Sequence, residues 1–257
     1  MRSSTPGHWD RYWRERQEID QVYTNEDRLL AQVRDLPLPR MRVLEVGAGS
    51  GRDSLRMARE GARVVLLDYV MSAFDVITAQ AADAGVRVVC VCGEATRMPF
   101  REGAFDLVFH QGLMEHFRDP RPLLDENYRV TARGGFCLID VPQRFHPYTV
   151  AKHIMIALNR WFAGWETEFS PGELRRLVTR AGYEVVRIGG DWMVPGFGYR
   201  ALRYALMRSR ITRLPQYPGE VRGIGALQRR VRDWARGRRF GPYTFAMVNV
   251  LARRPSD

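Results

Sequence analysis

The sequence contains almost no lysine. Lys152 is the only lysine among 40 basic residues, and the others are all arginine. A bias this strong is typical of GC-rich codon usage, so the preference for arginine over lysine is not itself taken as a functional signal.

Cysteine and long apolar runs are also scarce. Cys90, Cys92 and Cys137 show no CxxC spacing, and each lies in a run that predicts a buried strand. We therefore expect reduced thiols, no disulfide and no metal site, as in a cytoplasmic protein. No stretch approaches the ~18 apolar residues of a membrane span, and the first residues lack the apolar region of a secretory signal.

The positive charge is confined to one part of the chain. The formal net charge is +11, yet residues 1–190 contribute only +1 and residues 191–257 contribute +10. A basic protein whose charge covered every face would suggest nucleic acid as a partner, whereas a basic tail on a neutral body gives much weaker support to that reading.

Hydrophobic periodicity predicts alternating strands and helices. The strands are continuous apolar runs, which indicates burial on both faces and hence a mainly parallel sheet with helices on each side, a doubly wound α/β fold. The predicted helices are Arg52–Glu60, Ser72–Ala84, Arg121–Val130 and Pro171–Ala181. The predicted strands are Arg42–Val46, Arg63–Asp68, Val86–Cys92, Phe105–His110, Gly135–Val141, Tyr183–Ile188 and Tyr243–Ala252.

A glycine-rich turn follows the first predicted strand. It reads Gly47-Ala48-Gly49-Ser50-Gly51 and leads directly into a predicted helix, whose free N–H groups favour a bound ligand. The second strand ends at Asp68, 17 positions beyond Gly51, where a carboxylate can accept hydrogen bonds from a ribose diol. This spacing indicates a nucleoside cofactor. A nicotinamide site would prefer GxGxxG, and the sixth position of that motif is here Arg52.

Further motifs follow in a fixed order along the chain. Glu94-Ala95 precedes Arg97-Met98-Pro99-Phe100, then come FDLVFHQGLMEHF over residues 105–117 and RVTARGG over residues 129–135. With VLEVGAGSG and Asp68, residues 40–190 resemble the class I S-adenosylmethionine-dependent methyltransferases, in particular their small-molecule subgroup. The resemblance implies a Rossmann-like, seven-stranded, mainly parallel sheet whose last strand is antiparallel, with helical cap insertions.

The resemblance also implies a binding site for S-adenosylmethionine. The loop residues Gly47, Ala48, Gly49 and Gly51 would surround its methionine part, and Glu45 would support the loop.

Residues after the next strands would complete that cofactor site. Asp68 would hold the ribose, Tyr69 would cover the adenine and Glu94-Ala95 would meet the adenine amino edge, although most relatives have Asp in place of Glu94. His110 and Gln111 would contact the amino-acid end of the cofactor.

The predicted cofactor-binding core comprises residues 41–192 and 243–257. Three segments, one of them an insertion within this core, are candidates for substrate binding. Residues 1–40 predict an N-terminal helical cap whose aromatics either fold over the cofactor or pack on the sheet edge. Residues 142–168 form a substrate-side insertion, and residues 193–242 an arginine-rich helical insertion or lid. Side chains singled out for substrate contact are Tyr12, His146, Tyr148 and Trp165.

Basic amphipathic stretches such as residues 193–242 can serve several ends. They can cover apolar surface as a lid, meet an acidic substrate or carrier, or bind an anionic membrane surface. Nucleic acid is the least favoured partner, and the sequence gives no indication of oligomeric state.

The expected reaction is methyl transfer to an O, N or C nucleophile of a small, partly apolar molecule, by in-line displacement that releases S-adenosylhomocysteine. A hydroxyl acceptor needs a base, for which His116 is our choice among Glu115, His116, His110 and His146. Two alternatives stay open, a non-catalytic nucleoside-binding scaffold and an NAD-type oxidoreductase with a degenerate glycine loop. Arginine usage and the resemblance together favour bacterial secondary metabolism.

Overall fold

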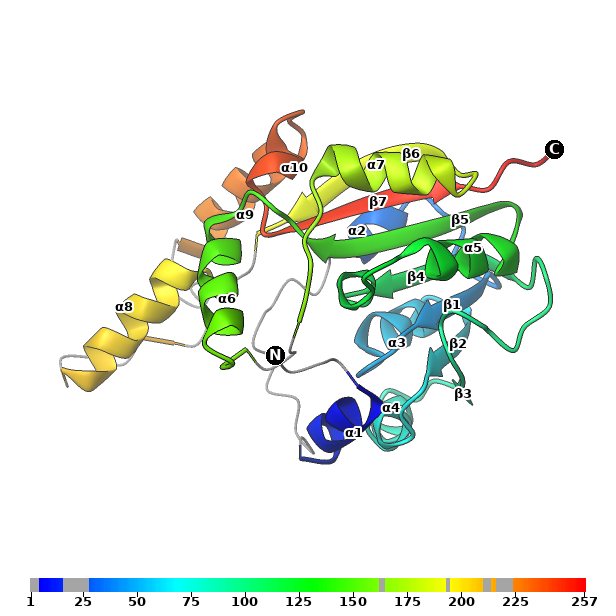
Figure 1. Cartoon of the computed structure of the whole chain (residues 1–257), viewed down its shortest axis with the longest axis horizontal. Helices are drawn as coiled ribbons and strands as arrows, with labels where there is room; N and C mark the ends of the chain where they lie inside the picture. Colours follow the sequence, from blue (N-terminus) through cyan, green and yellow to red (C-terminus); the bar gives the residue numbers. More distant parts are fainter. Residues whose placement is uncertain (1–4, 16–27, 162–164, 193–194, 210–213, 216–223) are drawn as a thin grey trace.

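The computed structural model describes residues 5–15, 28–161, 165–192, 195–209, 214–215 and 224–257 (Figure 1). Its centre is a single sheet of seven strands: β1 (Arg42–Val46), β2 (Arg63–Asp68), β3 (Val88–Cys92), β4 (Phe105–Gln111), β5 (Thr131–Pro142), β6 (Glu184–Asp191) and β7 (Met247–Arg253). The strand order is β3-β2-β1-β4-β5-β7-β6. Strands β1 to β5 pair in parallel, and β7 pairs antiparallel with both β5 and β6, which confirms the predicted Rossmann-like architecture.

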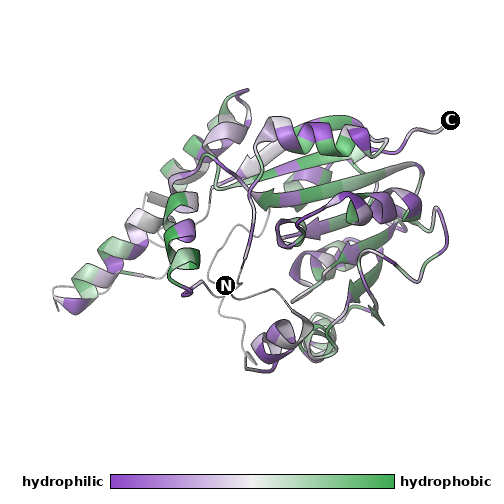
Figure 2. Cartoon of the chain, in the orientation of Figure 1, coloured by the Kyte–Doolittle hydropathy of each residue, from purple (hydrophilic) through white to green (hydrophobic). Residues whose placement is uncertain are grey.

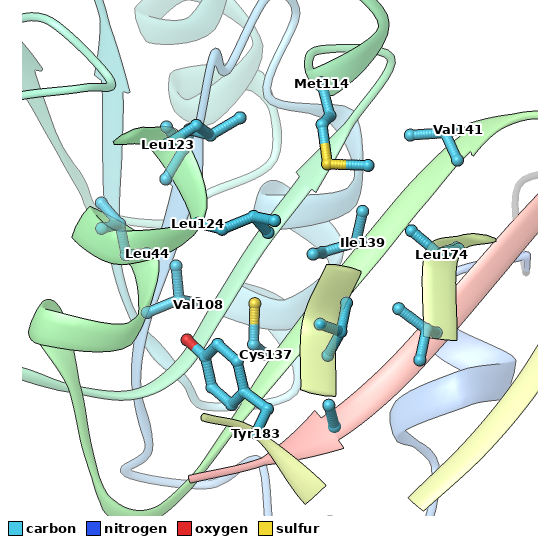
Figure 3. Close-up of a cluster of buried hydrophobic side chains, with 14 of the residues drawn as sticks. Leu44, Val108, Met114, Leu123, Leu124, Cys137, Ile139, Val141, Leu174 and Tyr183 are labelled. Carbon is cyan, nitrogen blue, oxygen red and sulfur yellow. The ribbon is translucent and has the colours of Figure 1, made fainter. Parts of the chain in front are cut away.

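Helices cover both faces of the sheet. On one face α2 (Leu30–Val33), α3 (Arg52–Arg59) and α4 (Ser72–Asp83) supply Val33, Met57 and Ile77 to a buried cluster. On the other face α5 (Arg121–Val130) and α7 (Pro171–Arg180) pack on the strands. Figure 3 shows this second core, in which Leu124 and Leu174 face the side chains of β1, β4 and β5. The two layers bury the strands on both faces, as the continuous apolar runs predicted.

The start of α7 illustrates how local sequence determines a helix boundary. The Ser170 hydroxyl accepts a hydrogen bond from Glu173 N at 3.2 Å, and Glu173 Oε2 accepts one from Ser170 N at 2.9 Å. This reciprocal pair satisfies two backbone donors that the first helical turn leaves free, and Pro171 occupies the first helical position.

Two predictions about the strands were wrong in detail. Cys92 is exposed and Cys90 only half-buried, because β3 is the edge strand and has a neighbour on one side only. The last strand begins at Met247 instead of residue 243, since residues up to Thr244 form the short helix α10 (Gly241–Thr244). Pro242 stands in its first turn, where a missing N–H costs nothing.

The remaining helices lie outside this layered core. They are α1 (Pro6–Glu15), the short η1 (Met114–His116), α6 (Pro147–Ala157), α8 (Phe197–Arg208) and α9 (Ile224–Arg236). Helices α6, α8 and α9 gather at one end of the long axis of the molecule, opposite the C-terminus (Figure 1). None of the described helices is both long enough and apolar enough to cross a bilayer.

Candidate active site

The carboxyl ends of the parallel strands form one edge of the sheet, where doubly wound folds bind their ligands. Strand β1 runs into the loop of residues 47–51, β2 ends at Asp68, β4 ends at Gln111 and β5 ends at Pro142. The predicted cofactor residues after β1, β2 and β4 are therefore brought to the same edge.

The glycine loop has a backbone that only glycine adopts easily. Gly47, Gly49 and Gly51 all have positive φ angles, of 66°, 52° and 65°. A Cβ on Gly51 would lie 2.7 Å from a methyl group of Leu66, and one on Gly49 would lie 2.9 Å from the Trp13 ring. The loop is thus closed to side chains, and α3 begins immediately after it with its free N–H groups at this edge.

Asp68 is held inward by the backbone around it. Its Oδ2 accepts a hydrogen bond from Gly49 N at 3.1 Å and its Oδ1 accepts one from Val70 N at 3.0 Å. The side chain is buried, and burial raises the pKa of the carboxyl above its usual value. Asp68 therefore faces the glycine loop and not bulk water.

Tyr69, Glu94 and Ala95 lie next to Asp68. Asp68 is aligned with Cys92 across β2 and β3, and Gly93 N donates to the Asp68 carbonyl at 3.0 Å. The side chain of Glu94 is exposed and Tyr69 is 37% exposed. These residues lie at the end of the site where the resemblance assigns the adenosine.

Glu45 lies beneath the glycine loop and is almost fully buried. Burial raises the pKa of its carboxyl to about 8, and the nearby Asp53 carboxylate acts in the same direction. The carboxyl of Glu45 is therefore protonated, and so uncharged, at neutral pH.

A buried polar network lies at the ends of β4 and β5, and Gln111 is the member of it that the sequence analysis named. Arg28 Nη2 lies 2.9 Å from Asp140 Oδ2, and Asn249 Nδ2 donates to Asp140 Oδ1 at 3.3 Å. The Gln111 amide lies between Arg28 and Asp53, with its nitrogen assigned to face Asp53 Oδ2 at 2.9 Å. Arg28 lies in the predicted N-terminal cap, far from β5 in the sequence, so its approach to β5 is visible only in three dimensions.

His110 is fully buried within β4. Burial lowers the pKa of its imidazole to about 3, and neither ring nitrogen has a hydrogen-bond partner among the described residues. The side chain is therefore neutral and enclosed by the sheet, so the structure leaves its backbone as the part that could meet a cofactor.

Helix α1 lies over the edge of the sheet. The Trp13 ring contacts Gly49, and Trp9 packs edge-on against His116 with ring centroids 5.3 Å apart. Tyr12 makes edge contacts with both tryptophans, and Asp10 O accepts a hydrogen bond from Ser72 Oγ at the start of α4, at 3.3 Å. Helix α1 thus packs on α4 and also brings Trp13 beside the glycine loop and Trp9 beside His116.

His116 lies at the end of η1, below Trp9. Burial lowers the pKa of its imidazole, with the Glu166 carboxylate and the Trp165 backbone acting in the opposite direction. Its Nδ1 is buried and makes no hydrogen bond within the described part of the chain. A neutral imidazole with one open nitrogen is the form that accepts a proton. The neighbouring Glu115 is also buried, and burial raises its pKa well above the usual value.

The substrate-side insertion contains the other predicted contacts. His146 Nδ1 accepts a hydrogen bond from Tyr148 N at 3.1 Å and thereby caps α6. The Tyr148 ring meets Trp161, and the Arg118 guanidinium lies over Trp165, 4.5 Å from its ring centroid. His146 thus has a structural task, whatever it does for substrate.

A second buried charge cluster holds α6 to the loop that follows it. Lys152 Nζ lies 2.8 Å from Glu166 Oε2 and 2.6 Å from Glu168 Oε1, and its side chain is 1% exposed. His153 Nε2 lies 2.7 Å from Glu168 Oε2, and Trp161 Nε1 donates to Glu166 Oε1 at 2.9 Å. The only sequence signal for this cluster is that the chain's single lysine stands in a largely apolar stretch.

Known methyltransferases resemble this chain in sequence and in fold. The profile of a methyltransferase domain family matches residues 44–139, which run from β1 into β5. A solved S-adenosylmethionine-dependent methyltransferase from Thermotoga maritima shares the fold with a TM-score of 0.63 and 17% identity, over 96% of this chain and 98% of that one. Over this domain the chain is similar to the class I S-adenosylmethionine-dependent methyltransferases.

Two further similarities add detail to the methyltransferase assignment. A ubiquinone biosynthesis O-methyltransferase from Ruegeria is 29% identical over 158 residues, or 59% of this chain and 64% of the relative. The magnesium protoporphyrin IX methyltransferase of Synechocystis, solved with bound S-adenosylhomocysteine, aligns over 96% of this chain with a TM-score of 0.56 and 12% identity.

The cofactor of this methyltransferase family is S-adenosylmethionine, and the described residues fit it. The positive φ angles of Gly47, Gly49 and Gly51 turn the loop so that α3 begins at this edge, and Asp68 presents a buried carboxylate beside it. Among the described residues, no cluster of His, Cys, Asp and Glu side chains could hold a metal ion.

Proposed function

We propose that the protein transfers the methyl group of S-adenosylmethionine to an O, N or C nucleophile of a small, partly apolar organic molecule. The observation that carries this proposal is the aromatic roof: α1 lies over the glycine loop and over His116 at once, through Trp13 and Trp9. Aromatic side chains at both the cofactor loop and the candidate base would suit a partly apolar acceptor.

The cofactor, when bound, supplies a sulfonium methyl that is already activated. The protein then contributes mainly positioning and the exclusion of water. Asp68 and the glycine loop would fix the nucleoside, while Trp9, Tyr12 and Trp13 would keep water from the acceptor.

The Ruegeria relative is named for O-methylation, so a hydroxyl is the first acceptor class to test. Methylation of a hydroxyl needs a base, and His116 is our proposed one because its neutral ring has a buried, open Nδ1. Tyr148 and Trp165 remain proposed acceptor contacts. We also propose a cytoplasmic enzyme whose segment 193–242 meets an anionic partner.

Replacement of His116 by Gln tests the base. We expect turnover with a hydroxyl acceptor to fall by roughly 10²- to 10⁴-fold, while the affinity for S-adenosylhomocysteine changes by less than about twofold, within ordinary surface-mutation effects. Release of labelled methyl product gives the first quantity and titration calorimetry the second. The control is His153→Gln, which alters a half-exposed imidazole of the same region. Equal losses of turnover and affinity would assign His116 to architecture.

The two alternative functions are tested by ligand titration of the whole chain. We expect S-adenosylhomocysteine to raise the melting temperature and NAD to leave it unchanged. Stabilisation by NAD alone would indicate an oxidoreductase. Binding of S-adenosylhomocysteine with no methyl transfer to any acceptor would favour the scaffold.

A further inference from the structure

Helix α6 buries polar side chains and exposes apolar ones, which is the reverse of an ordinary surface helix. Its polar side chains Thr149 and Lys152 are buried, while Val150, Ile154 and Leu158 at its end are 65%, 56% and 59% exposed. These three residues are spaced four apart, so they form one apolar stripe along the helix. A helix that buries lysine and exposes such a stripe is suited to surroundings less polar than water.

Two other helices at this end of the molecule also expose apolar side chains. Helices α8 and α9 occupy the same end of the molecule as α6 (Figure 1), and Figure 2 shows green, apolar segments on α6 and α8. We call the exposed apolar side chains of these three helices the cap face. Besides the α6 stripe it comprises Leu202, Tyr204 and Met207 of α8 and Leu227, Val231 and Trp234 of α9. Exposed apolar side chains gathered at one end of a molecule mark sites of interaction.

Positive charge accompanies the cap face. Arg208, Arg230 and Arg238 are exposed, and the Arg238 guanidinium lies over the Trp234 ring at 5.3 Å from its centroid. Among the described residues of 195–246, Asp233 is the only acidic one. Arginines placed among exposed aliphatic and aromatic side chains match an anionic lipid interface, which offers phosphates at its surface and hydrocarbon below.

We propose that the cap face docks on an anionic membrane surface. The apolar side chains of α6, α8 and α9 would enter the headgroup region, with Tyr204 and Trp234 at the boundary that aromatic residues prefer. A second copy of the chain is a poorer occupant, because its cap face would bring the same positive charge. If the proposed acceptor is apolar, docking would bring the enzyme to where that acceptor concentrates, but the binding itself does not depend on the proposed reaction.

Vesicle co-sedimentation of the full chain tests the proposal. We expect binding to vesicles of phosphatidylcholine mixed with phosphatidylglycerol, and little binding to phosphatidylcholine alone. High salt should release the protein, because screening weakens the arginine contacts. Equal binding to both vesicles, or binding to neither, would overturn the proposal.

Paired variants assign the binding to the cap face. Arg208→Gln with Arg230→Gln should weaken partition into the anionic vesicles by roughly 25-fold, and serines at Val150, Ile154 and Leu158 should weaken it by at least about tenfold. The controls are Arg59→Gln with Arg87→Gln, and Val89→Ser, all exposed on the sheet domain. Equal losses in test and control variants would contradict the assignment.

Two further measurements separate the outcomes. Thermal stabilisation by S-adenosylhomocysteine should be the same in the cap-face variants as in the parent, which shows that they are folded and keeps this test distinct from that of methyl transfer. Light scattering gives the oligomeric state. A dimer that the three serines dissociate, without vesicle binding by the parent, would identify a second copy as the occupant and refute the lipid.

Discussion

Glu45 lies under the glycine loop with its carboxyl shielded from water, and the pKa of that carboxyl is about 8 against an ordinary 4.5. The folded protein therefore keeps a proton that the unfolded chain releases. As pH rises from about 4.5 to about 8, this residue lowers the free energy of unfolding, and above that window its effect is constant.

Replacement of Glu45 by Gln should remove this pH dependence. We expect the variant to gain stability relative to the parent as pH rises through that window, by at most about 1.4 kcal/mol per pH unit, with little difference near the lower end. Urea unfolding across the window measures it. Glu94→Gln, an exposed site at the same edge, is the control. A gap that is constant with pH would mean that Glu45 is ionised in the folded protein.

At the scale of the element, α1 is joined to the site through Trp13. The ring lies against Gly49, so α1 reaches the part of the loop where the resemblance places the methionine moiety. Replacement of Trp13 by Ala should weaken S-adenosylhomocysteine binding by roughly tenfold, because an enclosing aromatic surface is lost. Calorimetry measures it, with Trp234→Ala as the control at the distant α9. Tighter binding in Trp13→Ala would show that α1 occludes the pocket.

The anchor of α6 makes a second prediction for an element. Burial, the largest single effect, acts to lower the pKa of Lys152, but the Glu166 and Glu168 carboxylates together outweigh it and raise that pKa. Lys152→Met would leave both carboxylates buried without their cation, and we expect a loss of about 3–5 kcal/mol in the free energy of unfolding.

The same change made together with Glu166→Gln and Glu168→Gln should cost much less, because no buried charge is then left unpaired. Urea unfolding of the parent, the single variant and the triple variant gives the coupling. An equal loss in the single and triple variants would mean that the ion pairs do not stabilise the attachment of α6.

For the whole molecule, sequence patterns identified those features that are encoded locally. The bounds of β1 and β2 and the glycine turn follow from residues next to each other in the chain. Arg28 beside Asp140 and Lys152 between Glu166 and Glu168 could not be predicted, since no local pattern indicates which buried charges meet. The edge position of β3 is likewise a property of the complete sheet, which is why Cys92 was misjudged.

The burial of Lys152 has a practical consequence. Because it is the chain's sole ε-amine and lies on the buried side of α6 at 1% exposure, an acylating reagent should not modify it while the helix stays packed. Time-resolved labelling followed by mass spectrometry would then report the rate at which α6 detaches from the rest of the protein.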